Sequence, residues 1–337
     1  MDSLTQVVLG AAVGEAAIGK KVGNWAILWG AVAGTIPDLD VFAKHFTDNI
    51  TALEIHRGFS HSIVFSVIFA PIFGWIVSKI HRKLDATWKD WTWLMFLALI
   101  THPLLDAHTT WGTQLFWPLE YRLDYKNIFV VDPLYTLPFM IFLIAAMFYN
   151  KTSLKRRKLN NIGLIVSSCY MLLTVGIKWY TYPKFTQALQ NKKIAYVEVK
   201  TRPTPLNSIL WAANVMVDEG FLIGYYSLFD KSDDIIYSDF IPKNHHLLGD
   251  MENEKKIKQL IKITEGWYTI EEKEGKLLLN DLRFGQSSVN AQITTDFIFS
   301  FELFYDEKGE FQAIERPRTM KDGGKMFGQL IERIKGI

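Results

Sequence analysis

The sequence predicts an α-helical membrane bundle followed by a soluble, β-rich α+β domain. Charge density predicts this division, because the first 182 residues carry 28 charged side chains whereas the remaining 155 carry 44. Apolar patterning agrees, since four long apolar runs lie in the first part and a period-two alternation typical of strands begins after it. We therefore expect a membrane-embedded helical domain at 1–182 and a soluble extramembrane domain at 183–337.

The overall composition argues against some classes of function. The 337 residues include 37 basic and 35 acidic side chains, which give a formal net charge of +2. A dedicated nucleic-acid binder usually presents a strongly basic face, so we expect no nucleic-acid partner. The single cysteine, Cys169, excludes a disulfide scaffold and a zinc site built from several thiolates.

Four apolar runs approach the length of about 20 residues that a membrane-spanning helix needs. They are Ile63–Ile80, Trp91–Leu105, Leu134–Tyr149 and Ile162–Tyr182, with Trp and Tyr side chains at their ends. Two shorter runs, Val7–Ile18 and Trp25–Ile36, are rich in Gly and Ala. Because small residues allow close helix packing, we expect four clear spans plus a short N-terminal hairpin, with a re-entrant pair as the alternative.

Loop charge predicts the orientation. The connections at 19–24, 79–90 and 150–160 contain 11 basic residues, and the opposite connections at 37–62 and 106–133 contain 4. Basic loops favour the cytoplasmic side of a membrane. The less basic connections and everything after residue 182 are therefore expected on the non-cytoplasmic side.

Three short polar segments interrupt this apolar region. They are Pro37-Asp38-Leu39-Asp40, the stretch from His56 to Ser62, and the stretch from Thr101 to His108. Each adjoins an apolar run at its outward end, so the topology brings all three to one membrane depth. Ionisable groups at that depth are costly unless they pair or serve a site.

The spacing of these residues is consistent with one shared site. Asp38 and Asp40 are two residues apart, so an extended turn would point their side chains the same way. His102 and Asp106 are four residues apart and share one helical face. For the aspartate pair, a helix-capping role is the simpler alternative.

The middle segment contributes two imidazoles. His56 and His61 flank a Gly-containing turn at a helix start, where Ser60 or Ser62 could cap the helix. Histidine nitrogens and carboxylate oxygens without thiolates suit Zn, Mn or Fe. We therefore predict a divalent metal site.

With these motifs the chain resembles the YdjM-type family of membrane-bound metal-dependent hydrolases. The resemblance covers about residues 1–180 and rests on Met1-Asp2-Ser3-Leu4-Thr5, Pro37-Asp38-Leu39-Asp40, His56-Arg57-Gly58-Phe59-Ser60-His61-Ser62 and His102-Pro103-Leu104-Leu105-Asp106. It implies a metal-dependent hydrolase in a bacterial inner membrane. The candidate metal ligands that it implies are Asp38, Asp40, His56, His61, His102 and Asp106. The chain departs from many members in having Gln6, a poor substitute for an imidazole ligand, after Thr5.

The preferred function is a membrane-bound hydrolase with a divalent metal, zinc with Mn or Fe as alternatives, at the outer face of the inner membrane. Its expected partners are membrane lipids and a small-molecule or lipid-linked substrate, such as a phosphoester. Asp40, with Asp38 as the alternative, is a candidate base that positions water. Arg57 or Arg122 is a candidate for binding a phosphate, although a loop ion pair is the preferred interpretation of Arg122. The alternatives are an ion or small-solute transporter and a non-enzymatic anchor that displays the C-terminal domain.

After Tyr182 the pattern predicts strands and two helices. The expected strands are Ile194–Thr201, Ile209–Asp218, Gly220–Phe229, Trp267–Glu272, Lys276–Leu282, Gln292–Phe297 and Phe301–Tyr305. Glu252–Ile263 has the pattern of a charged amphipathic helix, and Lys321–Ile337 is a candidate terminal helix. The segment contains neither a nucleotide-binding loop nor a Gly-x-Ser-x-Gly motif.

Overall fold

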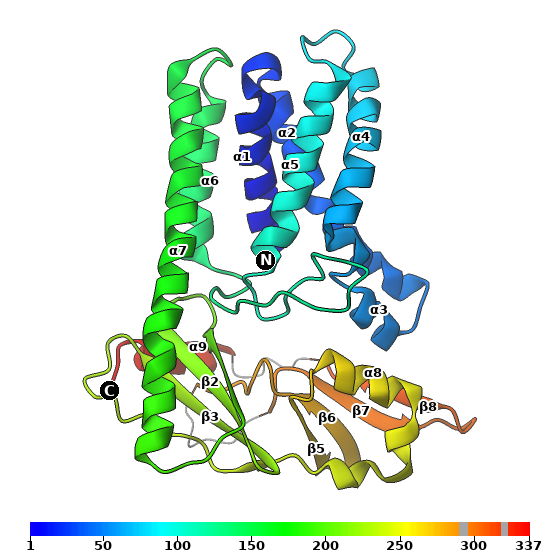
Figure 1. Cartoon of the computed structure of the whole chain (residues 1–337), viewed down its shortest axis with the longest axis vertical. Helices are drawn as coiled ribbons and strands as arrows, with labels where there is room; N and C mark the ends of the chain where they lie inside the picture. Colours follow the sequence, from blue (N-terminus) through cyan, green and yellow to red (C-terminus); the bar gives the residue numbers. More distant parts are fainter. Residues whose placement is uncertain (290–295, 318–322) are drawn as a thin grey trace. The chain divides into compact units, whose positions relative to one another are not determined.

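The computed structural model describes residues 1–289, 296–317 and 323–337, and these form two compact units (Figure 1). The helical unit comprises Met1–Phe46, Ile55–Gly176 and Pro205–Asn207. The β-rich unit comprises Thr47–Glu54, Ile177–Thr204 and Ser208–Ile337. Helix α7 (Leu154–Asn191) is continuous across residue 182, and the domain boundary at residues 182 and 183 stays a prediction.

The helical unit contains the apolar runs that the sequence analysis identified, except that the end of the run Ile162–Tyr182 belongs to the β-rich unit from Ile177 onward. Its elements are α1 (Ser3–Val22), α2 (Asn24–Thr35), η1 (Pro37–His45), η2 (Phe59–His61), α4 (Ile63–Ile80), α5 (Trp88–Asp106), α6 (Pro133–Met147) and the first part of α7. The long helices run side by side, and α1 contacts α2, α5 and α6 (Figure 1).

Two helices within the described ranges, α4 and α7, are long and apolar enough to cross a membrane. A third span is added if α2 and η1, which bend by 44° at a short break, form one broken span or a re-entrant loop. Helix α6, with 15 residues, is shorter. The helical region thus contains two or three candidate spans, and the predicted total of four stays a prediction.

Helices α1 and α2 form the tight hairpin that their small residues predict. A Cβ atom built at Gly14 would lie 2.3 Å from the carbonyl oxygen of Ala26, and one built at Gly10 would lie 2.3 Å from that of Gly30. The two backbones are therefore in direct contact, which no residue larger than glycine permits at these positions. This contact places the first turn of α1 beside the end of α2.

The start of α4 is fixed by a side-chain cap. The hydroxyl of Ser62 accepts a hydrogen bond from the backbone amide of Phe65 at 3.0 Å, as one of the two predicted capping options requires. Ser60, the other option, donates instead to Asp40. This cap sets the position of His61 directly before the helix.

The β-rich unit contains two antiparallel four-stranded sheets among its described residues. The first consists of β1 (Glu198–Pro203), β2 (Leu210–Val217), β3 (Gly220–Ser227) and β4 (Ile241–Pro242). Side chains alternate across it: Trp211 and Val215 pack with Phe185 of α7, whereas Ala212 packs with Leu330 of α9 (Gly323–Ile334). This sheet is therefore covered on both faces.

The second sheet consists of β5 (Tyr268–Lys273), β6 (Lys276–Asp281), β7 (Ser300–Tyr305) and β8 (Phe311–Glu315). It packs against η3 (His245–Asn253) and α8 (Lys255–Ile263). Strand β8 was not predicted. The strand expected at Gln292–Phe297 lies largely outside the described residues.

A short helix from the first half of the chain completes this core. Helix α3 (Asn49–Ile55) inserts Ile50, which is 1% exposed, among Leu248, Ile257 and Leu260. Its Glu54 accepts a hydrogen bond from Gln259 at 2.9 Å. Residues 47–54 thus belong to the core of the β-rich unit, although they lie between two of the predicted metal-site motifs.

Candidate metal centre

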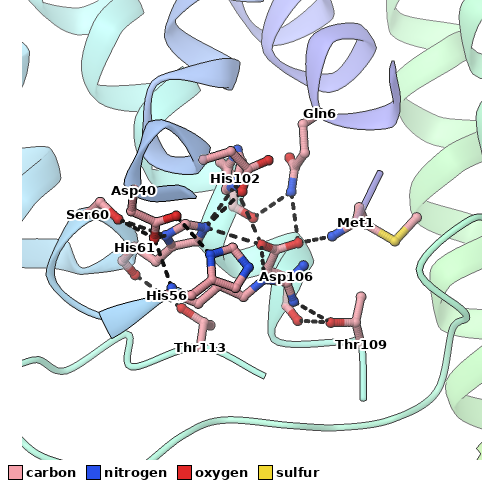
Figure 2. A network of polar contacts seen from close by, with 12 residues as sticks. Met1, Gln6, Asp40, His56, Ser60, His61, His102, Asp106, Thr109 and Thr113 are labelled. Atoms are coloured by element: carbon pink, nitrogen blue, oxygen red, sulfur yellow. Dashed lines mark hydrogen bonds and ion pairs between the residues drawn. The ribbon is translucent and has the colours of Figure 1, made fainter. Parts of the chain in front are cut away.

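Four side chains from the three polar segments converge on one point of the helical unit. Asp38 comes from η1, His61 ends η2, and His102 and Asp106 lie one turn apart on α5. One donor atom from each lies within 4.8 Å of all the others, and three of the four residues are fully buried. Figure 2 shows the imidazoles of His61 and His102 facing one another beside Asp106.

Five distances between these donor atoms are close to the edge length of a metal-binding tetrahedron. The Nε2 atoms of His61 and His102 are 3.1 Å apart. Asp38 Oδ1 lies 3.3 and 3.4 Å from these two nitrogens, and Asp106 Oδ2 lies 3.4 and 3.5 Å from them. In a tetrahedral site with metal–ligand distances of about 2.0 to 2.1 Å, ligand atoms lie about 3.3 to 3.4 Å apart. The residues therefore fit a small divalent cation.

The hydrogen bonds around His102 leave its Nε2 available as a ligand. Its Nδ1 lies 2.6 Å from the carbonyl oxygen of Gly34. A carbonyl only accepts, so Nδ1 carries a proton, and in the neutral form of the ring Nε2 then keeps its lone pair. The tight α1–α2 hairpin, which fixes Gly34, thereby also orients a candidate metal ligand.

The two oxygens of Asp106 have different partners. Its Oδ1 accepts hydrogen bonds from Gln6 Nε2 at 3.0 Å and from the amino group of Met1. Its Oδ2 is buried, accepts no hydrogen bond from the described residues and forms an ion pair with Arg57 Nε at 3.1 Å. Because Oδ2 accepts no hydrogen bond, it is the oxygen of this carboxylate that could bind a cation.

His61 is surrounded by carboxylates on both sides of its ring. Burial opposes protonation of this imidazole, but its contacts with Asp106, Asp38 and Asp40 outweigh burial and raise the pKa of His61 to about 9. The same negative surroundings that hold a proton there favour a metal cation.

The extended turn expected for Asp38 and Asp40 is wrong, because Pro37–His45 forms a 3₁₀ helix. In such a helix, residues two apart point in different directions. Asp38 Oδ1 accordingly lies 3.3 Å from His61 Nε2, whereas Asp40 Oδ2 lies 3.3 Å from His61 Nδ1. The two aspartates hold opposite nitrogens of one imidazole.

Asp40 and His56 are adjacent to the four-donor group but are not part of it. Asp40 Oδ1 lies 2.8 Å from His56 Nδ1, and its Oδ2 accepts hydrogen bonds from the Arg57 amide and the Ser60 hydroxyl, each at 2.9 Å (Figure 2). This geometry suits a carboxylate that orients a metal-ligating histidine. The predicted metal-ligand role of Asp40 and His56 and the predicted catalytic role of Asp40 stay predictions.

Comparison with known proteins agrees with the motif analysis. The family model for YdjM inner membrane protein matches residues 1–185. The chain belongs to the YdjM inner membrane protein family. The matched range contains all four donor residues and nearly the whole helical unit. The curated proteins and the solved structures that were compared gave no match to the chain.

Two further side chains of this YdjM-family chain complete the surroundings of the four donors. Gln6 lies on the first turns of α1, is 1% exposed, and also donates to the carbonyl oxygen of His102 at 3.3 Å. Arg57 is 5% exposed and donates from Nη1 to Thr109 at 2.8 Å. The departure at Gln6 thus places an amide beside Asp106, and the predicted catalytic role of Arg57 stays a prediction.

Several contributors carried no sequence signal. Gly34 acts through its backbone carbonyl, which no residue type reveals. Thr113 supports His61 by donating to its carbonyl oxygen at 3.3 Å, and Thr109 accepts from Arg57. The loop after α5 contains both threonines, and only their proximity to the third motif could have singled them out.

Proposed function

We propose that this YdjM-family protein is a membrane-bound, metal-dependent hydrolase. The single observation that supports this most is the group of four buried or half-buried donors, in which the distances that involve the two imidazoles, 3.1 to 3.5 Å, suit a tetrahedral cation. Two imidazoles and two carboxylates favour zinc, with Mn or Fe as alternatives. His61, His102, Asp38 and Asp106 would hold the metal.

A divalent metal bound there supplies Lewis-acid polarisation of water and of an ester or phosphoryl oxygen. The chain's own groups prepare the centre for this. Gly34 and Asp40 orient the two imidazoles, and burial excludes bulk water from three of the four ligands. Arg57, beside Asp106, is placed to contact an anionic oxygen of a substrate.

The surroundings of the centre favour an amphiphilic substrate, a lipid or a lipid-linked phosphoester. The 3₁₀ helix η1, which carries Asp38, exposes Leu39 and Phe42 at 53% each, and Phe46 follows it at 87%. Large apolar groups that remain exposed beside a polar centre suit a ligand with both an apolar and a polar part.

We also propose four membrane spans, with the centre and the C-terminal domain on the non-cytoplasmic side of the inner membrane. The support is the excess of basic residues in the connections at 19–24, 79–90 and 150–160. A C-terminal reporter that is active only in the cytoplasm should stay silent. A strong signal would reverse this orientation.

Metal analysis of the purified full-length protein tests the centre. His61→Ala and Asp106→Asn should each reduce the bound metal to background, because removing one ligand from a four-ligand site weakens binding severely. His45→Ala is the matched control, since His45 is an exposed imidazole near the first motif. If His61→Ala keeps its full metal content with an unchanged circular dichroism spectrum, the proposed centre is wrong.

Activity needs a separate measurement. The metal-loaded protein should hydrolyse a lipid phosphoester dispersed in detergent, and His102→Ala should abolish turnover while His45→Ala retains it. Bound metal without turnover of any phosphoester or carboxyl ester would favour the transporter instead. Absence of both metal and turnover would favour the anchor.

A further inference from the structure

A second polar feature of the helical unit lies at the opposite end of α4 from His61. A cavity of about 680 Å³ opens there. Its lining residues are Pro71, Trp75, Ser78, Lys79, Arg82, Ala86 and Trp88. Because α4 has 18 residues, its two ends are separated by about 27 Å, so this cavity is distinct from the metal centre.

The cavity lining changes from apolar to basic towards the end of α4. Pro71, Trp75 and Ser78 follow one another at spacings of four and three residues, so they lie on one face of α4. Lys79 in the last turn of α4 and Arg82, just after the helix ends at Ile80, form the basic end of this line. A ligand that follows the line meets apolar carbon first and two positive charges last, which is the polarity of a lipid with an anionic head group.

The basic end keeps its charge free for a ligand. The nearest helix start carries Asp90, but this carboxylate pairs with Lys21 at 2.7 Å. In the parts of the chain that the structure describes, neither Lys79 nor Arg82 forms an ion pair with an acidic side chain. The ammonium of Lys79 instead lies 5.5 Å from the centre of the Trp75 ring.

Two exposed tryptophans mark this end as a membrane interface. Trp75 is 55% exposed and Trp88 is 49% exposed. Indole rings collect at the level of lipid head groups, where one edge meets acyl chains and the other meets water. The outer face of α4 is apolar up to this level, with Ile72 at 46% and Ile76 at 41% exposure.

We propose that this cavity binds an anionic phospholipid. Lys79 and Arg82 contact its phosphate, and one acyl chain lies along Trp75 and Pro71. Basic pockets between membrane helices recognise anionic head groups in this way. The site differs from the metal centre in residues and in location, so it does not depend on the proposed hydrolase activity.

Native mass spectrometry of the full-length protein in a neutral detergent tests the proposal with dioleoyl phosphatidylglycerol as the probe. The double variant Lys79→Gln/Arg82→Gln should weaken phosphatidylglycerol binding by roughly tenfold or more. The matched control is Lys83→Gln/Lys89→Gln, which removes the same charge from exposed neighbours that do not line the cavity. Its affinity should stay within about twofold of wild type.

Three results would overturn the proposal. Equal weakening in the two double variants would mean that only general surface charge attracts the lipid. Equal affinity for phosphatidylcholine and phosphatidylglycerol in the wild-type protein would mean that the basic pair selects no head group. Displacement of bound phosphatidylglycerol by millimolar inorganic phosphate would identify a free-anion site instead. Unchanged melting temperatures in both double variants ensure that the comparison concerns binding.

Discussion

The helical unit and the β-rich unit differ in how far they expose large apolar side chains. On α4, Val67 and Trp75 are each 55% exposed, whereas every residue of β3 is buried. The helical unit also buries apolar side chains, such as Trp91 and Leu99 of α5, and it buries backbone against backbone at Gly10 and Gly14 of α1. This difference follows from the solvent, because a bilayer solvates large apolar groups and water does not. Hydropathy thus tells which residues avoid water, not which residues form a core.

The two units also treat buried charge differently. In the β-rich unit, the buried charges of Arg283 and Asp281 form a closed pair at 2.7 Å, and the half-buried Arg333 pairs with Asp230 at 2.6 Å. The helical unit contains a closed pair of this kind, Glu15 with Arg156, and this explains Glu15 as a structural group. At the metal centre, buried charges instead share partners: Asp106 pairs with the Met1 amino group and with Arg57, and it also lies 3.4 Å from His61. A cluster of shared buried charges, rather than a closed pair, therefore marks the candidate site.

The contrast between the two units is tested most strongly by a substitution at Ile50. This residue comes early in the sequence but packs in the core of the β-rich unit. Ile50→Ala should destabilise that unit by about 2 to 5 kcal/mol, because it leaves a cavity among Leu248, Ile257 and Leu260. Hydrogen exchange measured by mass spectrometry should show faster exchange in peptides from β6 and β7.

Ile55→Ala is the control, since Ile55 ends the same helix but is 42% exposed. It should change the exchange of β6 and β7 very little. Equal acceleration in the two variants would mean that α3 acts through its helix propensity and not through the buried contact of Ile50.

The insertion of α3 shows where sequence reasoning reached its limit. Every apolar run became a helix and three polar motifs converged, because period and composition reflect local chemistry. The opposed positions of Asp38 and Asp40 depended on whether the turn was extended or 3₁₀, which their spacing alone does not determine. The place of Ile50 depended on packing across 200 residues of chain. Contacts between residues so far apart in the chain produce no periodic pattern in the sequence.

A smaller effect on stability is expected at the α1–α2 hairpin, where two helix backbones are in direct contact. Gly14→Ala should destabilise the helical unit by about 1 to 3 kcal/mol, because the new methyl group would overlap the backbone of Ala26. This overlap outweighs the gain of about 0.5 to 1 kcal/mol that alanine brings to a helix interior. Thermal unfolding in detergent should show a lower melting temperature.

Gly176 of α7 provides a matched control of opposite sign. A Cβ atom at Gly176 meets no other heavy atom within 4 Å. Gly176→Ala should therefore leave the melting temperature unchanged or raise it slightly. A lowered melting temperature for Gly176→Ala, or an unchanged one for Gly14→Ala, would contradict the view that α1 and α2 pack through their backbones.

The smallest effect concerns the start of α3. Asp48 accepts hydrogen bonds from the amides of Ile50 and Thr51 and from the Thr51 hydroxyl. Partial burial opposes its ionisation, but these hydrogen bonds outweigh burial and lower the pKa of Asp48. Asp48→Ala should cost about 1 kcal/mol at pH 7, as the loss of an N-terminal cap does.

The effect of Asp48→Ala should depend on pH in one direction. A carboxyl group whose pKa is lowered by folding stabilises the protein above its ordinary pKa and loses that contribution as the pH falls through the lowered value. The stability difference between wild type and Asp48→Ala should therefore be largest near pH 7 and shrink in acid. Asp48→Asn, which keeps an acceptor but does not ionise, should resemble wild type at pH 7. A difference between wild type and Asp48→Ala that grows in acid would show that the carboxylate does not stabilise α3.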